Sequence, residues 1–511
     1  MKNTFSKTVG LIIICGIGFT HCAELEEDPS IANLSTATIN SVDAMEASVA
    51  GMYRALLDGA RWTDYYLAAF GGDDITTHSA SNKIAFRDAD LRRQTPSSAR
   101  LERAYEGPYS TIREANVVID IKDNIQGDPE VIDRLIGEAH FLRAFSYFHL
   151  TRTFGEVPLT VSSTVDATLG RASFLEIYTQ IENDLLEAER LLPDVYPGAS
   201  VGVRPSKGTA KAYLAKLYLH WAGFPLNDNG KYAQSAAMAK EVVDNAGTYG
   251  YGLVDNLRDL WVESKRFDQQ EGVFTLVFCG ECDRNAGNRT IGRLGLPGDI
   301  NSGWTEVFGE IRFFEDFEAD AQAEGTTARF NDTYFLDTVV SSNGDTVDAS
   351  NWRNFANEPH PLLRKAIGDF NETGASTNNN VSRYFMRYAE VLLIYAEASA
   401  RAGTATSEGF EALNQVRRRA AGVPSDTPDP SVDITSGDLA ALAFEERKWE
   451  LAGEFERWHD MVRMDIVAEV LATRSPDELV EGQPEISGKY LYFSPIPQSE
   501  LDIAPQLIES E

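Results

Sequence analysis

The chain has 511 residues, of which 43% are hydrophobic and 10% aromatic, and this composition indicates a folded globular protein rather than a disordered one. Its length exceeds what one hydrophobic core normally serves, so two lobes or one extended solenoid with insertions are expected. The formal net charge is −32. Because nucleic-acid-binding proteins present a basic face and none is evident in the sequence, a nucleic-acid partner is not expected.

The N-terminus has the pattern of an export signal. Two lysines precede the apolar run of residues 9–19, which is too short to span a bilayer as a stable anchor. The sequence Phe-Thr-His-Cys follows and is similar to a bacterial lipobox, in which the cysteine becomes lipid-modified and the new first residue. We therefore expect residues 1–21 to be a lipoprotein signal peptide, Cys22 to be the lipidation site, and residues 22–40 to be a lipid-anchored tether. A simple secretory peptide is the alternative.

Helical periodicity dominates the rest of the chain. Apolar residues recur at helical spacing in residues 42–57, 101–121, 133–159, 174–192, 208–221, 232–245, 381–403, 408–420 and 439–467. Residues 272–278 are expected to form a strand, whereas residues 279–380 lose clear periodicity. Residues 59–90 are rich in Gly, Ser, Asn and Asp, and loops of this length in compact proteins are often functional.

The sequence pattern of one of these helices is repeated further along the chain. Residues 137–150 align without a gap on residues 208–221, with small and aromatic residues in matching order, and residues 387–403 are a looser third copy. Small residues alternating with aromatics on repeated helices are typical of stacked helix pairs of the tetratricopeptide kind. The sequence therefore predicts a mostly α fold, a superhelix of tetratricopeptide-like helix pairs.

Clustered carboxylates near the C-terminus raise the question of catalysis. Glu446, Glu450 and Glu454 could include the acid and base of a glycosidase. On a helix they line one face at a spacing of four residues, and Arg447 reaches Glu450 or Glu454 by the same geometry. An ion-pair network is the plainer interpretation, and no catalytic residue is predicted.

Cysteines and histidines also have simple interpretations. Cys279 and Cys282 form a lone CxxC motif without the two further ligands that structural zinc needs nearby, so a local disulfide is expected, with free thiols as the alternative. His149 and His220 share one register of the repeat and are interpreted as helix-end core residues. We expect no metal site and no cofactor.

The seven tryptophans fall into two contexts. Four lie where packing is expected, namely Trp221, Trp261, Trp449 and Trp458. Trp62, Trp304 and Trp352 lie in polar loops. Sugar rings present C–H faces that stack on indole, and their hydroxyls need polar groups beside that surface, so these three are candidates for a carbohydrate site. Ordinary packing is the alternative for each of them.

Five segments in order resemble the SusD/RagB family of surface nutrient-binding lipoproteins. They are residues 137–159 (GEAHFLRAFSYFHLTRTFGEVPL), 204–223 (RPSKGTAKAYLAKLYLHWAG), 387–403 with 413–422 (RYAEVLLIYAEASARAG and LNQVRRRAAG), 445–464 (EERKWELAGEFERWHDMVRM) and 493–507 (FSPIPQSELDIAPQL). The resemblance implies one SusD-like domain at residues 41–511, with an irregular, loop-rich ligand-binding lobe beside the helices. Within it, we expect helical repeats at about 41–255 and 381–467, the irregular lobe at about 256–380, and a C-terminal tail at 468–511.

The resemblance also implies a function. Members of this family bind oligosaccharide or polysaccharide at the cell surface without catalysis, and deliver it to a SusC-like TonB-dependent transporter in the outer membrane. We therefore expect a surface-exposed outer-membrane lipoprotein that covers such a transporter as a lid. A peptide-binding protein of the RagB kind is the alternative, and an exported glycoside hydrolase is a more distant third.

A hypothesis for the site combines the resemblance with the loop residues. Trp62, Trp304 and Trp352 would form a stacking platform on one face of the irregular lobe. Hydrogen bonds would come from a facing loop, namely from Asp73, Asp74, His78 and Asn82, of which the two aspartates fit an acidic spot of the family. This hypothesis requires contact between residues 60–85 and 300–355.

Overall fold

The computed structural model describes residues 39–508, apart from residues 79, 165, 284, 291–293, 295–296, 299, 301–302, 356–358, 374–376 and 477–487. The predicted lipidation site Cys22 lies outside the described residues, as does nearly all of the predicted tether. In the part of the chain that is described, no helix is both long and apolar enough to cross a membrane.

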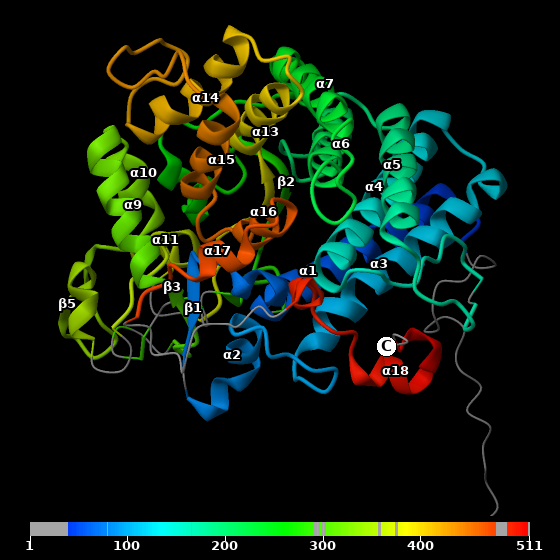
Figure 1. The fold of residues 1–511 in the computed structure, drawn as a ribbon. Helices are drawn as coiled ribbons and strands as arrows, with labels where there is room; N and C mark the ends of the chain where they lie inside the picture. The colour runs from blue at the N-terminus through cyan, green and yellow to red at the C-terminus, as the bar shows by residue number, and fades with distance from the viewer. Residues whose placement is uncertain are drawn as a thin grey trace, which may run out of the picture.

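The first half of the molecule is a row of helices that pack side by side in chain order (Figure 1). They are α1 (Val42–Ala60), α3 (Leu101–Asp120), α4 (Pro129–Phe154), α5 (Phe174–Leu191), α6 (Lys207–Trp221) and α7 (Lys231–Asp244). The row continues with α13 (Tyr388–Arg401), which packs against α7 and then against α14 (Ser407–Ala420) and α15 (Leu439–Glu450). The predicted mostly α fold is confirmed.

Local sequence explains where the central helices begin and end. The side chain of Asp128 accepts a hydrogen bond from the Glu130 amide at the start of α4, and Gly155 ends the helix with a φ of 75°. A capping box between Ser173 and Glu176 begins α5. Such caps satisfy backbone groups that a helix end leaves without partners.

The three predicted repeat copies are the helices α4, α6 and α13. Small residues let their neighbours approach, because a Cβ added at Gly137 would lie 3.0 Å from Leu192 Cγ, and one added at Gly208 would lie 2.5 Å from Tyr249 Cγ. His149 and His220 are buried, as predicted, and their rings pack against Tyr65 and Phe148.

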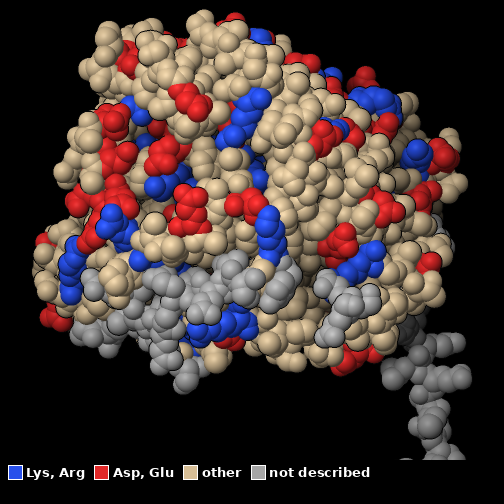
Figure 2. All heavy atoms as spheres, viewed as in Figure 1, with Lys and Arg blue, Asp and Glu red and all other residues tan. Residues whose placement is uncertain are grey.

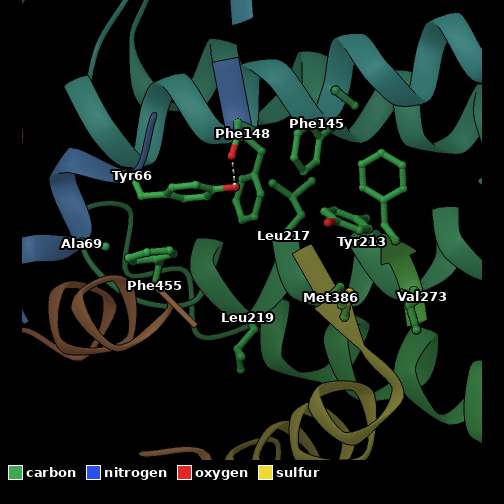
Figure 3. Packing of buried hydrophobic residues seen from close by; sticks show 14 of the residues in the cluster. Tyr66, Ala69, Phe145, Phe148, Tyr213, Leu217, Leu219, Val273, Met386 and Phe455 are labelled. Carbon is green, nitrogen blue, oxygen red and sulfur yellow. Dashed lines mark hydrogen bonds between the residues drawn. The ribbon is translucent and has the colours of Figure 1, made fainter. Parts of the chain in front are cut away.

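Aromatic side chains fill the space between these helices (Figure 3). Phe145 and Phe148 point from α4 toward Leu217 of α6. At one end of this cluster, Tyr66 stacks on Phe455 with ring centroids 4.4 Å apart, and its hydroxyl donates a hydrogen bond to the carbonyl oxygen of Ala60. One continuous core therefore joins the N-terminal helices to the C-terminal segment.

Short antiparallel strand pairs connect remote segments. β1 (Ile75–Thr77) pairs with β3 (Val307–Gly309), β2 (Gly272–Leu276) with β6 (Arg383–Arg387), and β4 (Thr338–Val340) with β5 (Thr346–Asp348). β2 confirms the strand expected at residues 272–278. The β1–β3 pair confirms the contact between residues 60–85 and 300–355.

Two predictions about periodicity are wrong in detail. The segment expected to be irregular contains α9 (Ile311–Glu324), which buries an apolar stripe that includes Phe313, Phe314 and Phe317, and α10 (Thr327–Thr333). The helix expected at residues 439–467 is divided into α15, α16 (Arg457–Arg463) and α17 (Val467–Leu471). Gly453 and Phe455 adopt positive φ between the first two, which a continuous helix does not allow.

Five further short α-helices are α2 (Ile84–Asp90), α8 (Ala246–Tyr249), α11 (Arg364–Ile367), α12 (Phe370–Thr373) and α18 (Gln498–Ile503). Of these, α11 is buried, and α18 lies near the C-terminus (Figure 1).

The close packing at Gly208, one of the glycines of the repeat, can be tested by a matched pair of substitutions. Gly208→Ala places its Cβ against the base of the Tyr249 ring, and overpacking of this kind costs about 1–3 kcal/mol. Gly51→Ala in α1 meets no atom within 4 Å and should instead gain about 0.5–1 kcal/mol from reduced backbone freedom. Denaturant unfolding of both variants measures the difference. Equal stabilities would contradict the close α6 packing.

Candidate functional site

Trp62 and Trp304, which are distant in the sequence, stack where the segment around residue 304 meets the first helices. Trp62 follows the end of α1, and Trp304 precedes β3. Their ring centroids lie 6.2 Å apart with an angle of 10° between the ring planes, and both side chains are partly exposed. Their proximity was required by the platform hypothesis and is confirmed, whereas their role in binding stays a prediction.

Backbone pairing and one lysine fix the position of Trp304. The β1–β3 pair holds the segment that follows Trp304 against the segment that follows Trp62. Lys83 Nζ donates a hydrogen bond of 2.6 Å to the Trp304 carbonyl oxygen and lies 3.3 Å from a Glu306 carboxylate oxygen. The indole pair is therefore held by its own loops before any ligand arrives.

Arginines surround the indole pair. The guanidinium carbons of Arg61, Arg103 and Arg289 lie 5.7, 4.9 and 5.3 Å from the ring centroid of Trp62, and that of Arg289 is also 5.3 Å from the centroid of Trp304. Cations at such distances are attracted to the negative face of an indole. The site thus combines a flat aromatic surface with several N–H donors.

A hollow of about 580 Å³ lies between α1 and α3 beside Trp62. Its polar lining includes Asp58, Asp64, Arg100, Arg103 and Glu106. Arg103 lines this hollow and also lies over the Trp62 ring, so it links the two. Its size and mixed lining suit a polar ligand held by stacking and hydrogen bonds.

A second hollow, of about 470 Å³, lies next to the first one along α3. Glu106 and Ser110 line both hollows, and the second one also includes Tyr105, Tyr109 and residues near the C-terminus. Tyr105 is buried and Tyr109 is partly exposed, so this hollow presents less open aromatic surface than the tryptophan pair.

Trp352 does not belong to the platform. Its side chain is only 2% exposed and packs against Phe314, with ring centroids 5.5 Å apart. A buried indole cannot stack on a ligand in this conformation, so this part of the hypothesis is wrong. Its loop neighbours Ser350, Asn351 and Arg353 are exposed, and it was their polarity that suggested an exposed tryptophan.

The predicted acidic pair is also buried and has structural partners. Asp73 accepts a hydrogen bond of 2.7 Å from Arg457, and Asp74 accepts one of 2.9 Å from the Gly453 amide. Burial would raise the pKa of Asp73, but Arg457 lowers it below its ordinary value. Burial raises the pKa of Asp74 to about 6. Both side chains hold the α15–α16 connection, and their predicted contact with a ligand is wrong.

The two remaining predicted residues, His78 and Asn82, lie near the tryptophan pair in the folded protein. His78 Nδ1 accepts a hydrogen bond from the Ala80 amide, and the His78 amide donates one to the Glu306 carbonyl oxygen. Burial and the charge of Lys83 lower the pKa of His78. Asn82 is exposed and next to Lys83. A role for His78 and Asn82 in binding stays a prediction.

Sequence reasoning missed the arginines and Lys83. Arg61 adjoins Trp62 in the chain, so a charged neighbour of a loop tryptophan was a usable signal. Arg103 and Arg289 come from α3 and from a remote loop, and no local pattern connects them with Trp62.

Comparison with known proteins agrees with this architecture. Residues 25–219 match a family model described as starch-binding and associating with the outer membrane, and residues 306–510 match the model of the SusD family. Together the two matches cover more than half of the chain. The chain belongs to the SusD/RagB family.

Relatives in the SusD/RagB family match over nearly the whole length. SusD-like protein P2 of Formosa agariphila is 26% identical over 504 residues, which cover 94% of this chain and 94% of that protein. A SusD homolog from Bacteroides thetaiotaomicron has a TM-score of 0.76 at 24% identity and covers 93% of this chain and 97% of its own. A structure described as a laminarin-binding SusD-like protein has a TM-score of 0.71 at 25% identity, with coverages of 90% and 98%.

The predicted carboxylates Glu446, Glu450 and Glu454, on or just after α15, belong to buried ion pairs, as predicted. Glu450 contacts Arg387 and Arg419, and Glu454 contacts Arg387 and Lys365. The predicted partner was wrong in one respect, because Arg447 pairs with Glu390 and Asp460 instead of Glu450 or Glu454. These carboxylates are enclosed rather than open to a cleft, which is unsuited to glycoside cleavage.

The described residues offer few other groups that could carry out chemistry. Cys279 and Cys282 form the expected disulfide. The described part of the chain contains no group of three His, Cys, Asp or Glu side chains arranged to hold a metal ion. On the visible face in Figure 2, the described Lys and Arg side chains are interspersed with Asp and Glu rather than gathered into one broad surface.

Glu450→Gln should destabilise the protein because it leaves Arg387 and Arg419 buried without a full counter-charge. Breaking a buried pair typically costs about 3–5 kcal/mol. Burial raises the pKa of Glu450, but the surrounding guanidinium groups outweigh it and lower the pKa to about 2. Because the folded-state pKa is depressed, the stabilisation is present above about pH 4.5 and is lost as the pH falls toward 2.

Urea unfolding at pH 7 and at pH 3.5 measures this effect. Glu445→Gln on the same helix is the control, because Glu445 is exposed and pairs with Lys448 at the surface, and such surface pairs contribute about 1 kcal/mol or less. A Glu450→Gln variant as stable as the Glu445→Gln variant would contradict the buried network.

Proposed function

We propose that the protein binds oligosaccharide or polysaccharide at the Trp62–Trp304 face without turning it over. The observation that carries this proposal is the partly exposed, nearly parallel indole pair with arginine side chains around it. The 25% identical relative described as laminarin-binding supports a carbohydrate ligand.

Binding at this face follows from ordinary interactions of sugars with proteins. The C–H face of a pyranose ring stacks on the indoles, and exposed aromatic surface next to polar groups favours such contacts. Arg103 and Arg289 then donate hydrogen bonds to ring hydroxyls. Because the indoles are already held by β1, β3 and Lys83, little ordering cost opposes binding.

The protein's place in the cell completes the proposal. An acylated Cys22 anchors it to the outer membrane at the cell surface, where it covers a SusC-like TonB-dependent transporter and delivers the bound glycan. The description of the family model that matches residues 25–219 supports association with the outer membrane. Enclosure of Glu450 and Glu454 in ion pairs supports binding without catalysis.

Trp304→Ala should weaken oligosaccharide binding more than tenfold, because loss of an aromatic anchor typically costs on the order of 2 kcal/mol or more. Its melting temperature should change little, since the side chain is partly exposed. Trp352→Ala is the matched control, and it should lose about 3–5 kcal/mol of stability while its folded fraction keeps full affinity.

A glycan-array screen of the soluble protein, starting at Ala23, first identifies the ligand that binds most tightly. Calorimetric titration with that ligand then measures the affinity of both variants. Chromatography of the same mixtures should recover the oligosaccharide unchanged. An unaltered affinity in Trp304→Ala, or product formation that Glu450→Gln abolishes, would contradict the proposal.

Cys22→Ala should move the protein from the membrane fraction to the soluble fraction, because acyl chains contribute about 0.8 kcal/mol of membrane affinity per buried CH₂ group. Cys15→Ala lies in the apolar run of the signal and should leave the protein in the membrane fraction. Immunoblots of fractionated cells measure this. Membrane association of Cys22→Ala in a strain without the transporter would refute lipid anchoring.

A further inference from the structure

Among the described residues, two guanidinium groups beside the tryptophan pair have no acidic partner. Arg61 is only 6% exposed, and its Nη1 donates to the Asn285 carbonyl oxygen, while its Nε is buried without a hydrogen-bond partner. Arg289 Nε is also buried without a partner. Within the described residues, no carboxylate lies within ion-pair distance of either side chain.

Neighbouring carboxylates are engaged by other arginines. Asp58 and Asp283 both bind Arg54, at 2.9 and 2.8 Å. Asp64 lies 3.2 Å from Arg100 and 3.5 Å from Arg103. Among the described residues, these acids leave Arg61 and Arg289 without a direct carboxylate partner, although Asp58 and Asp283 attract Arg61 from farther away and the chain as a whole carries a net charge of −32.

This arrangement is costly without a ligand. A buried charge is destabilising unless it is paired and hydrogen-bonded. Burial and repulsion from Arg289 both lower the pKa of Arg61, in that order of importance. An anion that approached the pair would offset both effects.

We propose, on the basis of the binding function above, that the sugar held at this face carries an anionic group, a carboxylate or a sulfate, which Arg61 and Arg289 recognise while the ring stacks on Trp62 and Trp304. The guanidinium of Arg289 is equally distant from the two indoles, so it holds the anion beside the stacked ring. Its planar fork of donors matches the oxygen pairs of carboxylate and sulfate. Arg61 is more deeply buried and adds positive charge.

The acidic surface of the protein does not prevent this. Charges farther away than the Debye length of about 8 Å at physiological ionic strength are largely screened. The guanidinium groups that contact the indole rings therefore govern the choice between neutral and anionic sugars.

Tetrasaccharides in matched pairs test the inference. The probes are uronate-containing oligosaccharides with their carboxyl-reduced forms, and sulfated galactan oligosaccharides with their desulfated forms. At least one anionic probe should bind ten times or more tighter than its neutral counterpart. Arg289→Gln should remove that preference, because it should weaken binding of the anionic probe about ten times more than binding of its neutral counterpart.

Arg353→Gln is the matched control. Arg353 also lies over an indole, that of Trp352, but it is exposed, paired with Glu315 and outside the proposed site, so its loss should change no affinity. Which pair of probes shows the preference distinguishes a carboxylate from a sulfate. Circular dichroism melts of both variants check that they are folded.

Three outcomes would overturn the inference. Equal or tighter binding of the neutral probes would remove the anionic preference and leave the proposed function intact. No binding of any glycan would defeat both. Binding of an acidic peptide, weakened by Arg289→Gln, with no binding of the glycans would replace the sugar by a peptide ligand.

Discussion

A buried ion-pair network centred on Arg387 holds the 256–380 segment against the helices. The guanidinium of Arg387, at the start of α13, contacts Glu271, Glu450 and Glu454. Arg329 of α10 and Lys365 of α11 reach the same carboxylates on or just after α15. Removing any one partner would leave a buried charge, so these segments stay attached together.

The candidate site lies where another part of the same 256–380 segment meets the first helices. One indole comes from the end of α1 and the other from the loop before β3, and the β1–β3 pair joins their segments. A rigid junction is useful for binding, because side chains that are already placed lose little entropy when a ligand arrives. Association of remote segments thus creates a surface that neither segment could form alone.

The sequence predicted correctly the features that are determined within a single segment. Periodicity and caps locate α4 and α6, and the polar context of Trp62 and Trp304 indicates exposure. The same context misled at Trp352, because the polarity of its neighbours does not determine which way the indole points. Asp73 and Asp74 were misassigned since their partners, Arg457 and Gly453, are remote in sequence. The arginines around the indoles meet only in the folded chain.

The most direct test of this account is a crystal structure of the protein soaked with the oligosaccharide that it binds best. The account predicts a sugar ring against the Trp62–Trp304 face, with Arg103 and Arg289 in contact with its polar groups. A sugar in the hollow beside Tyr105 and Tyr109, with no ligand at the two tryptophans, would contradict it.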